Sequence, residues 1–165
     1  MPKEIVTAKD LLITRRSLPH WQMGNTSYFV TFRTNQIDLT DEWKDIVVSC
    51  IAFGHQRKYG LSIGVVMSDH AHLLFYPMEK AEGVYFSLGE IMKPLKGVSA
   101  RNINKMRGGG QSIWQEEWFD RIIRDEDEWR EKYRYIQNNP VKRGLADTPE
   151  TYRWIIAGEN YLNSY

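Results

Sequence analysis

The chain is short of three things: cysteine, long apolar runs and net charge. Cys50 is the only cysteine, which excludes an intramolecular disulfide and a metal cluster built on several cysteines. No stretch approaches the roughly 18 apolar residues of a membrane span, and the residues after Met1 lack a signal-peptide core. The 22 basic and 21 acidic residues leave a net charge of +1, so no global field indicates a nucleic-acid or membrane partner. These absences predict a soluble cytoplasmic protein without a membrane partner.

Aromatic residues, in contrast, are abundant: 9 Tyr, 6 Trp and 6 Phe in 165 residues. Such a content is typical either of a well-packed core or of a surface on which nucleic-acid bases stack, and composition does not separate the two. The length fits one domain that buries a core of its own.

Local patterns along the chain predict an α+β fold. We expect strands where aromatic and β-branched residues gather, and helices where apolar residues recur every three to four positions. In chain order these are a strand at 28–32, a helix from Thr40 to about 54–58, a hairpin of strands 61–67 and 70–76, a loop at 78–86, a helix at 87–103 kinked near Pro94 and Gly97, a short strand at 112–115, and a helix from the acidic turn 125–128 to Asn139-Pro140. This βαββαβ order with an added C-terminal helix predicts a ferredoxin-like sandwich, a sheet with helices on one face.

The two ends of the chain lack such patterns. We divide the sequence into an irregular basic arm at 1–26, a domain at 27–146, and a C-terminal tail at 147–165 that packs on the domain. The arm carries Arg15, Arg16 and His20 beside aromatic residues. It therefore either packs on the domain or contacts nucleic acid.

The window 91–110 is the most basic part of the chain. It contains Lys93, Lys96, Arg101, Lys105 and Arg107 and no acidic residue. A run of this kind is usually a solvated helix face, but it can also follow a phosphate backbone. We favour the phosphate-binding interpretation because the run ends in a glycine-rich loop, a common place for binding residues.

The stretch 65–75 carries the strongest chemical signal, because this apolar, β-branched run contains His70 and His72. Side chains two residues apart on a strand share a face, so the two imidazoles make half of a metal site. On the last predicted helix, Tyr135 and Asn139 are four residues apart and share a face away from the apolar stripe. If the two faces meet, the imidazoles, the amide oxygen and the phenol surround one divalent cation, and the phenol could attack a phosphate.

Together these residues resemble a known family. The sequence His70-Ala71-His72, followed by YIQNNPVKRGL at 135–145, is similar to the single-tyrosine HUH transposases of the IS200/IS605 type. A narrower branch of this family is associated with bacterial repetitive extragenic palindromes. The chain resembles that branch in Arg16 and residues 18–20 of the arm, in the strand 28–32 and in the segment 114–124. The similarity spans most of residues 15–155.

The resemblance implies a bacterial nuclease domain that binds single-stranded DNA carrying hairpins. Tyr135 would cut the strand, hold its 5′-phosphate as a phosphotyrosine and free a 3′-OH, and strand rejoining would reverse the step. His70, His72 and Asn139 would hold Mg²⁺ or Mn²⁺. Gln137 is the alternative third ligand, because related enzymes often use glutamine.

The resemblance also implies DNA contacts and an oligomeric state. We expect the DNA contacts from Arg15, Arg16, His20, Lys93, Lys96, Arg101, Lys105, Arg107, Arg121 and Arg124. The insertion-sequence relatives are dimers that exchange the tyrosine helix, whereas the palindrome-associated branch is expected to act as a monomer. We therefore favour a monomer, with a dimer as the alternative.

Two other functions fit the same residues. The chain could bind single strands or hairpins without catalysis, using the sheet, the basic helix and the aromatic residues. It could also be a metal hydrolase of a small phosphoester, which would leave the basic window unexplained. Tyr133 is a rival nucleophile, although its position on the apolar stripe favours Tyr135.

Overall fold

The computed structural model describes residues 5–6 and 26–158. Its elements are β1 (Ile5–Val6), β2 (Tyr28–Arg33), α1 (Asp41–Gly54), β3 (Tyr59–Val66), β4 (His70–Pro77), β5 (Glu79–Ala81), β6 (Val84–Tyr85), α2 (Leu88–Arg107), β7 (Phe119–Ile122), α3 (Glu126–Lys142), the 3₁₀ helix η2 (Pro149–Thr151) and β8 (Ile155–Gly158). None of the helices in this described part is long and apolar enough to cross a bilayer.

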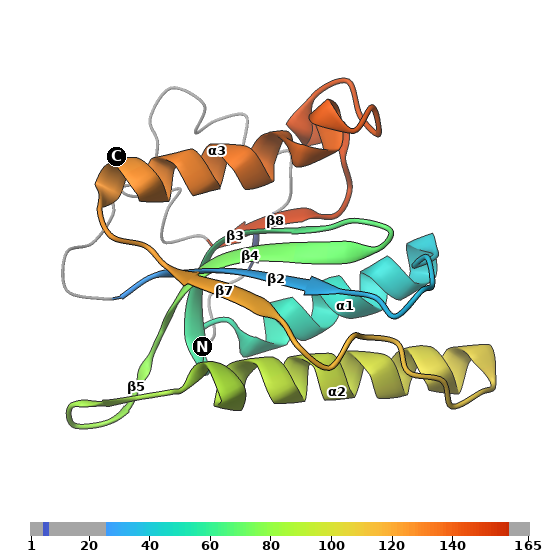
Figure 1. The fold of residues 1–165 in the computed structure, drawn as a ribbon, viewed down its shortest axis with the longest axis horizontal. Coiled ribbons are helices and arrows are strands. Elements are labelled where there is room, and N and C mark those ends of the chain that lie inside the picture. The colour runs from blue at the N-terminus through green and yellow to red at the C-terminus, as the bar shows by residue number, and fades with distance from the viewer. Residues whose placement is uncertain (1–4, 7–25, 159–165) are drawn as a thin grey trace.

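Within the described residues, six strands form one antiparallel sheet in the order β1-β8-β3-β4-β2-β7. The four strands β3-β4-β2-β7, with α1 after β2 and α2 after β4, have the βαββαβ order of a ferredoxin-like sandwich, so the predicted fold class is confirmed. Figure 1 shows α1 and α2 on one face of the sheet and the added helix α3 on the other. The sheet therefore lies between two helical layers.

Each face of the sheet has its own apolar core, because side chains alternate along every strand. On β2, Val30 and Phe32 belong to the core beneath α1 and α2. Phe29 points to the opposite face and joins the core beneath α3, which includes Trp129 and Tyr133. The α3 face therefore has to hold both a core and any polar site that lies on it.

The predicted helix starts at Thr40 and at the acidic turn are confirmed by their caps. The Thr40 hydroxyl accepts a hydrogen bond from the backbone N–H of Trp43, and the Asp125 carboxylate accepts one from Glu128. These bonds satisfy backbone donors that have no partner within the helix. The cap at Asp125 fixes where the tyrosine helix begins.

The predicted fourth strand at 112–115 is wrong. There Trp114 forms only an isolated bridge with Thr34, and its buried indole N–H donates to Ser99. The fourth strand is instead β7, which pairs with β2. All four side chains of β7 are exposed, so the strand lacks the apolar alternation that would have marked it.

Three further boundaries differ from the predictions. The predicted loop at 78–86 contains the hairpin β5-β6, and α2 is one continuous helix through Pro94. Helix α3 runs through Pro140 to Lys142 instead of ending before the proline. A proline removes one helical hydrogen bond, and the residue before it is only biased against the helix. Burial of Pro140 in the last turn offsets this cost.

The C-terminal segment is more than a tail. Tyr152 packs into the α3 core as expected, and its hydroxyl donates to the Val66 carbonyl at 2.8 Å. β8, however, is a strand of the sheet between β1 and β3, so part of the predicted tail belongs to the domain. β1, which the division places in the arm, also pairs into this sheet. The rest of the arm, with Arg15, Arg16 and His20, lies outside the described residues.

Candidate active site

The histidine pair lies on β4, on the sheet face that α3 covers. The ring centroids of His70 and His72 are 4.7 Å apart. His70 Nδ1 donates to the Asp69 carboxylate at 2.6 Å, and His72 Nδ1 forms a 2.7 Å hydrogen bond with the Thr31 hydroxyl. Because His70 Nδ1 donates to a carboxylate, its Nε2 carries the lone pair, which is the usual arrangement of metal-binding histidines, and the Thr31 hydroxyl holds the ring of His72. His70 Nε2 is buried and has no hydrogen-bond partner.

Both histidines are held in the neutral form. Burial lowers the pKa of His70 despite the opposing effect of the Asp69 carboxylate. Burial, followed by His70 and the guanidinium groups of Arg33 and Arg143, lowers the pKa of His72 to about 3. Neutral imidazoles can donate a lone pair to a cation at physiological pH.

Tyr135 lies on α3 directly over the histidine pair. Its ring centroid is 5.3 Å from that of His72 and 6.0 Å from that of Phe29, with both neighbours edge-on. The side chain is 40% exposed, so its hydroxyl is accessible to a substrate. Tyr133, the rival, is buried in the core, and burial raises its pKa. The structure thus brings Tyr135 to the histidines, whereas Tyr133 is a core residue.

Asn139 follows Tyr135 by one helical turn and is only 4% exposed. Its Oδ1 is buried without a hydrogen-bond partner, as is His70 Nε2 on the facing strand. Gln137, the alternative ligand, is half-buried. The described residues contain no group of three His, Cys, Asp or Glu side chains that could hold a metal ion. His70, His72 and Asn139 are thus the side chains whose nitrogen and oxygen donors could hold a divalent cation here.

Two cations near the site were missed by the sequence analysis. Arg33 is the direct cross-strand partner of His70, and Arg143, four residues after Asn139, is the C-cap residue of α3. Both side chains are exposed, and both guanidinium groups act electrostatically on His70 and His72. The spacing of Tyr135, Asn139 and Arg143 by four residues was the available signal for Arg143.

The basic window does not reach this site, because α2 lies on the other side of the sheet (Figure 1). Lys93, Arg101 and Lys105 are exposed there. Lys96 is a correction: it is buried, and its ammonium donates to the carbonyls of Gln115 and Glu116 at 2.7 Å each. Lys96 therefore has a structural role and leaves the set of candidate DNA contacts.

The remaining predicted contacts already have partners within the chain. Arg107 donates to Gln111 at 3.0 Å. Arg121 on β7 and Arg124 both pair with the Glu128 carboxylate on α3. Burial alone would raise the pKa of Glu128, but hydrogen bonds from Arg124 and Arg121 outweigh it and lower the pKa to about 2. The two arginines thus attach β7 to the start of the tyrosine helix.

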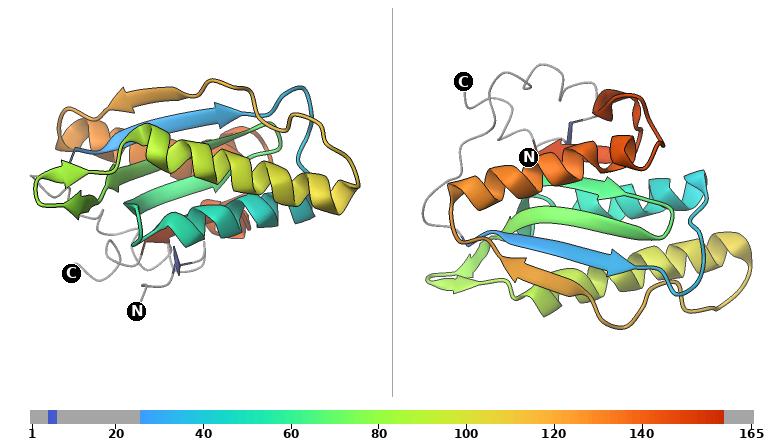
Figure 2. Two further views of the ribbon diagram at one scale, coloured as in Figure 1. Left: turned by 90° about the horizontal axis from the view of Figure 1, so that it is seen from below. Right: turned by 45° about the horizontal axis from the view of Figure 1, so that its top comes forward.

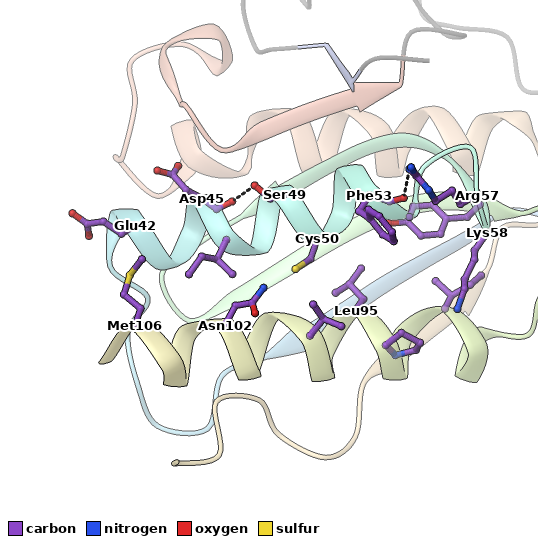
Figure 3. Close-up of a pocket in the computed structure, with 16 residues that line it drawn as sticks. Glu42, Asp45, Ser49, Cys50, Phe53, Arg57, Lys58, Leu95, Asn102 and Met106 are labelled. Atoms are coloured by element: carbon purple, nitrogen blue, oxygen red, sulfur yellow. Dashed lines mark hydrogen bonds between the residues drawn. The ribbon is translucent and has the colours of Figure 1, made fainter. Parts of the chain in front are cut away.

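A hollow between two helices lies away from this chemistry. An apolar groove of about 780 Å³ lies between α1 and α2, on the face of the sheet opposite Tyr135, and Figure 3 shows the side chains that line it. Ile46, Leu95 and Val98 contribute to its lining, together with Cys50. Burial raises the pKa of the Cys50 thiol, so the groove offers no activated nucleophile.

The fold and the site together define a class: a ferredoxin-like sheet with a histidine pair and a helix-borne tyrosine on one face. The chain belongs to the family of IS200-like transposases, whose pattern residues 27–139 match. A solved structure of a REP-associated tyrosine transposase bound to a REP hairpin has the same fold. Its TM-score is 0.64 at 18% identity, over 82% of this chain and 79% of that chain. An uncharacterised protein of Haemophilus influenzae is 29% identical over 93 residues, 47% of this chain, and the match spans about half (52%) of that relative's length.

Proposed function

We propose that the protein nicks and rejoins single-stranded DNA at hairpins through a covalent bond between Tyr135 and a 5′-phosphate. The observation that carries this proposal is the position of the Tyr135 ring, 5.3 Å from His72 between centroids. Two buried, unpaired atoms support it further: His70 Nε2 on the facing strand, and Asn139 Oδ1 one turn after Tyr135 on α3. A nucleophile beside a cation-binding donor set is the arrangement that phosphoryl transfer needs.

In the proposed step the Tyr135 oxygen forms a bond to phosphorus and the bond from phosphorus to O3′ breaks. The leaving O3′ takes up a proton and becomes a free 3′-OH, while the phenol proton passes to water, to which the side chain is open. Rejoining reverses both bonds. The edge-on contacts with His72 and Phe29 orient the phenol, and Arg33 and Arg143 favour the approach of an anionic backbone.

His70, His72 and Asn139 would hold Mg²⁺ or Mn²⁺. When bound, the ion would act as a Lewis acid on a phosphate oxygen. Asp69 and Thr31 fix the two rings through Nδ1, and the low pKa of His72 keeps its imidazole neutral. Such supporting hydrogen bonds are needed because an unsupported ring rotates away from its ligand position.

Membership of the transposase family and the fold shared with a hairpin-bound REP-associated enzyme support DNA hairpins as the substrate and DNA transposition as the process. Tyr135 and His72 meet within one chain, which supports a monomer over a dimer that exchanges the tyrosine helix. The positive charge near the site is local, so the strand would be drawn to this face of a nearly neutral protein.

The test is incubation with a labelled single-stranded hairpin oligonucleotide and Mg²⁺ or Mn²⁺, followed by denaturing electrophoresis. A covalent protein–DNA band should form with the wild type and disappear in Tyr135→Phe. Tyr133→Phe is the matched control, because it removes a buried hydroxyl that has no hydrogen-bond partner. An adduct that persists in Tyr135→Phe would overturn the proposal, and hairpin binding without any cleavage would point to the non-catalytic alternative.

A further inference from the structure

A row of paired residues extends from the candidate site to the edge of the sheet. Thr31 on β2 is the direct partner of His72 on β4 and of Phe119 on β7. Directly paired residues of antiparallel strands point to the same face, with Cβ atoms about 5 Å apart. His72, Thr31 and Phe119 therefore lie side by side on the face that carries Tyr135.

The side chains of this row become more exposed toward β7. His72 and Thr31 are buried, whereas Phe119 is 58% exposed. Helix α3 packs against β3 and β4, and Figure 2 (right) shows β7 beyond the area that this helix covers. An aromatic ring is thus left open on the site's own face, beside the buried residues that support the histidines.

An exposed ring next to a phosphate-handling site fits the base of a single-stranded nucleotide. Every base has a π-face, so stacking on an aromatic side chain tolerates sequence and supplies affinity. Arg33 adds a cation on the same face: it pairs with His70 in the sheet, and the described residues give its guanidinium no hydrogen bond or ion pair. The ring is a partner for the base of a nucleotide, and the guanidinium is a partner for its phosphate.

We infer that Phe119 is a stacking platform for an unpaired base next to the scissile phosphate. The inference rests on the proposed function and adds a nucleotide-binding subsite to it. The phosphate would sit at His72 and Tyr135, and the adjoining base would lie over β7. A folded hairpin stem cannot stack a base there, so the subsite selects the single-stranded flank of the hairpin.

The test first locates the cleavage site on a hairpin oligonucleotide with wild-type protein and Mn²⁺. A single abasic residue is then placed at each position that flanks the cut. At one position it should lower kcat/KM for adduct formation by about 5- to 150-fold, the range expected for loss of one stacked base. Phe119→Ala should show the same loss with the intact oligonucleotide and no further loss with that abasic one, and Phe119→Trp should restore the rate.

Ile122→Ala is the matched control. Ile122 is on the same strand and 56% exposed, but it pairs with Tyr28 and so lies on the opposite face. This variant should keep the wild-type rate and the wild-type response to abasic residues. If the losses from Phe119→Ala and from the abasic residue multiply when the two changes are combined, the inference is overturned. It is also overturned if Phe119→Ala keeps the wild-type rate.

Failure of the proposed function has a different signature. If the wild type forms no adduct, stacking is still measured by the fluorescence of 2-aminopurine placed in the single-stranded flank. Quenching that is lost in Phe119→Ala and kept in Ile122→Ala would then support the base subsite without cleavage. Equal quenching in all three proteins would overturn it.

Discussion

The two faces of the sheet are open in different ways. Beneath α1 and α2 a groove of about 780 Å³ is lined mainly by apolar side chains. On the α3 face lie two fixed imidazoles, an exposed tyrosine, and the unpaired atoms His70 Nε2 and Asn139 Oδ1. Volume alone would select the groove face. Buried polar atoms without partners are costly, so these two support the α3 face as the ligand site, although Tyr133 Oη and Ser62 Oγ are unpaired as well.

The largest expected effect concerns two buried histidines. His72→Ala should lower adduct formation at least about 100-fold, because it removes a proposed metal ligand, while hairpin affinity should change little. His55→Ala is the control, since His55 is also buried but accepts a hydrogen bond from the Leu61 N–H at 2.9 Å and lies away from Tyr135. Gel assays of the adduct and binding titrations measure the two quantities. Equal loss of cleavage and binding in His72→Ala would mean that the ring is structural.

The second effect concerns the buried lysine of α2. Lys96→Met should lower the free energy of unfolding by about 1–3 kcal/mol, because two backbone carbonyls lose a charged donor while the apolar stem is kept. Urea denaturation measures this change. The salt dependence of hairpin binding should stay as in the wild type, and a smaller salt slope would return Lys96 to the set of DNA contacts.

A smaller, pH-dependent effect is expected at Glu128. Its pKa of about 2 in the folded protein lies below the ordinary glutamate value of 4.5, so the ionised carboxylate stabilises the fold above about pH 4.5. This contribution is lost as the pH falls toward 2, because the folded state then binds the proton as well. Glu128→Gln should therefore cost about 1 kcal/mol at pH 7 and progressively less as the pH falls below 4.5.

The matched control for Glu128 is Glu131→Gln, whose carboxylate is exposed and pairs with the neighbouring Lys132. Urea denaturation of the three proteins at pH 7, 4.5 and 3 gives the comparison. A difference between wild type and Glu128→Gln that does not change with pH would contradict the assigned ion pairs.

The smallest effect is expected on the groove face. Phe53 is 68% exposed at the rim of the groove, and Phe53→Ser should change the free energy of unfolding by no more than about 0.5 kcal/mol. Adduct formation should remain within twofold of wild type. A large loss of cleavage in Phe53→Ser would show that the two faces are coupled and would break the distinction drawn between them.

Much of the site could be predicted from sequence because its parts are local. His70 and His72 are fixed by the two-residue period of a strand, and Tyr135 and Asn139 by the four-residue spacing of a helix. Arg33 could not be found in this way, since its position depends on the register between β2 and β4. The third ligand, the metal and the role of Tyr135 remain predictions that the proposed experiments test.

The fold was predictable where apolar patterns are strong and failed where they are weak. β3 and β4 are almost wholly buried, and their residues show it in the sequence. β7 is exposed along its length, and the hairpin β5-β6 likewise, so neither carries a periodic signal. Lys96 shows the converse. Its place in a basic run predicts a DNA contact, but its ammonium donates to two carbonyls about twenty residues away, which no local pattern indicates.

The sequence by itself determined the strand β2, the hairpin β3-β4 and the three helices, together with the shared face of the two histidines and the shared face of Tyr135 and Asn139, because each follows from backbone periodicity within one element. Only the tertiary structure decided that these faces meet within one chain, that β8 completes the sheet, and that Phe119 remains open beside the site. Such facts depend on strand register and helix packing between distant segments, and no local pattern encodes them.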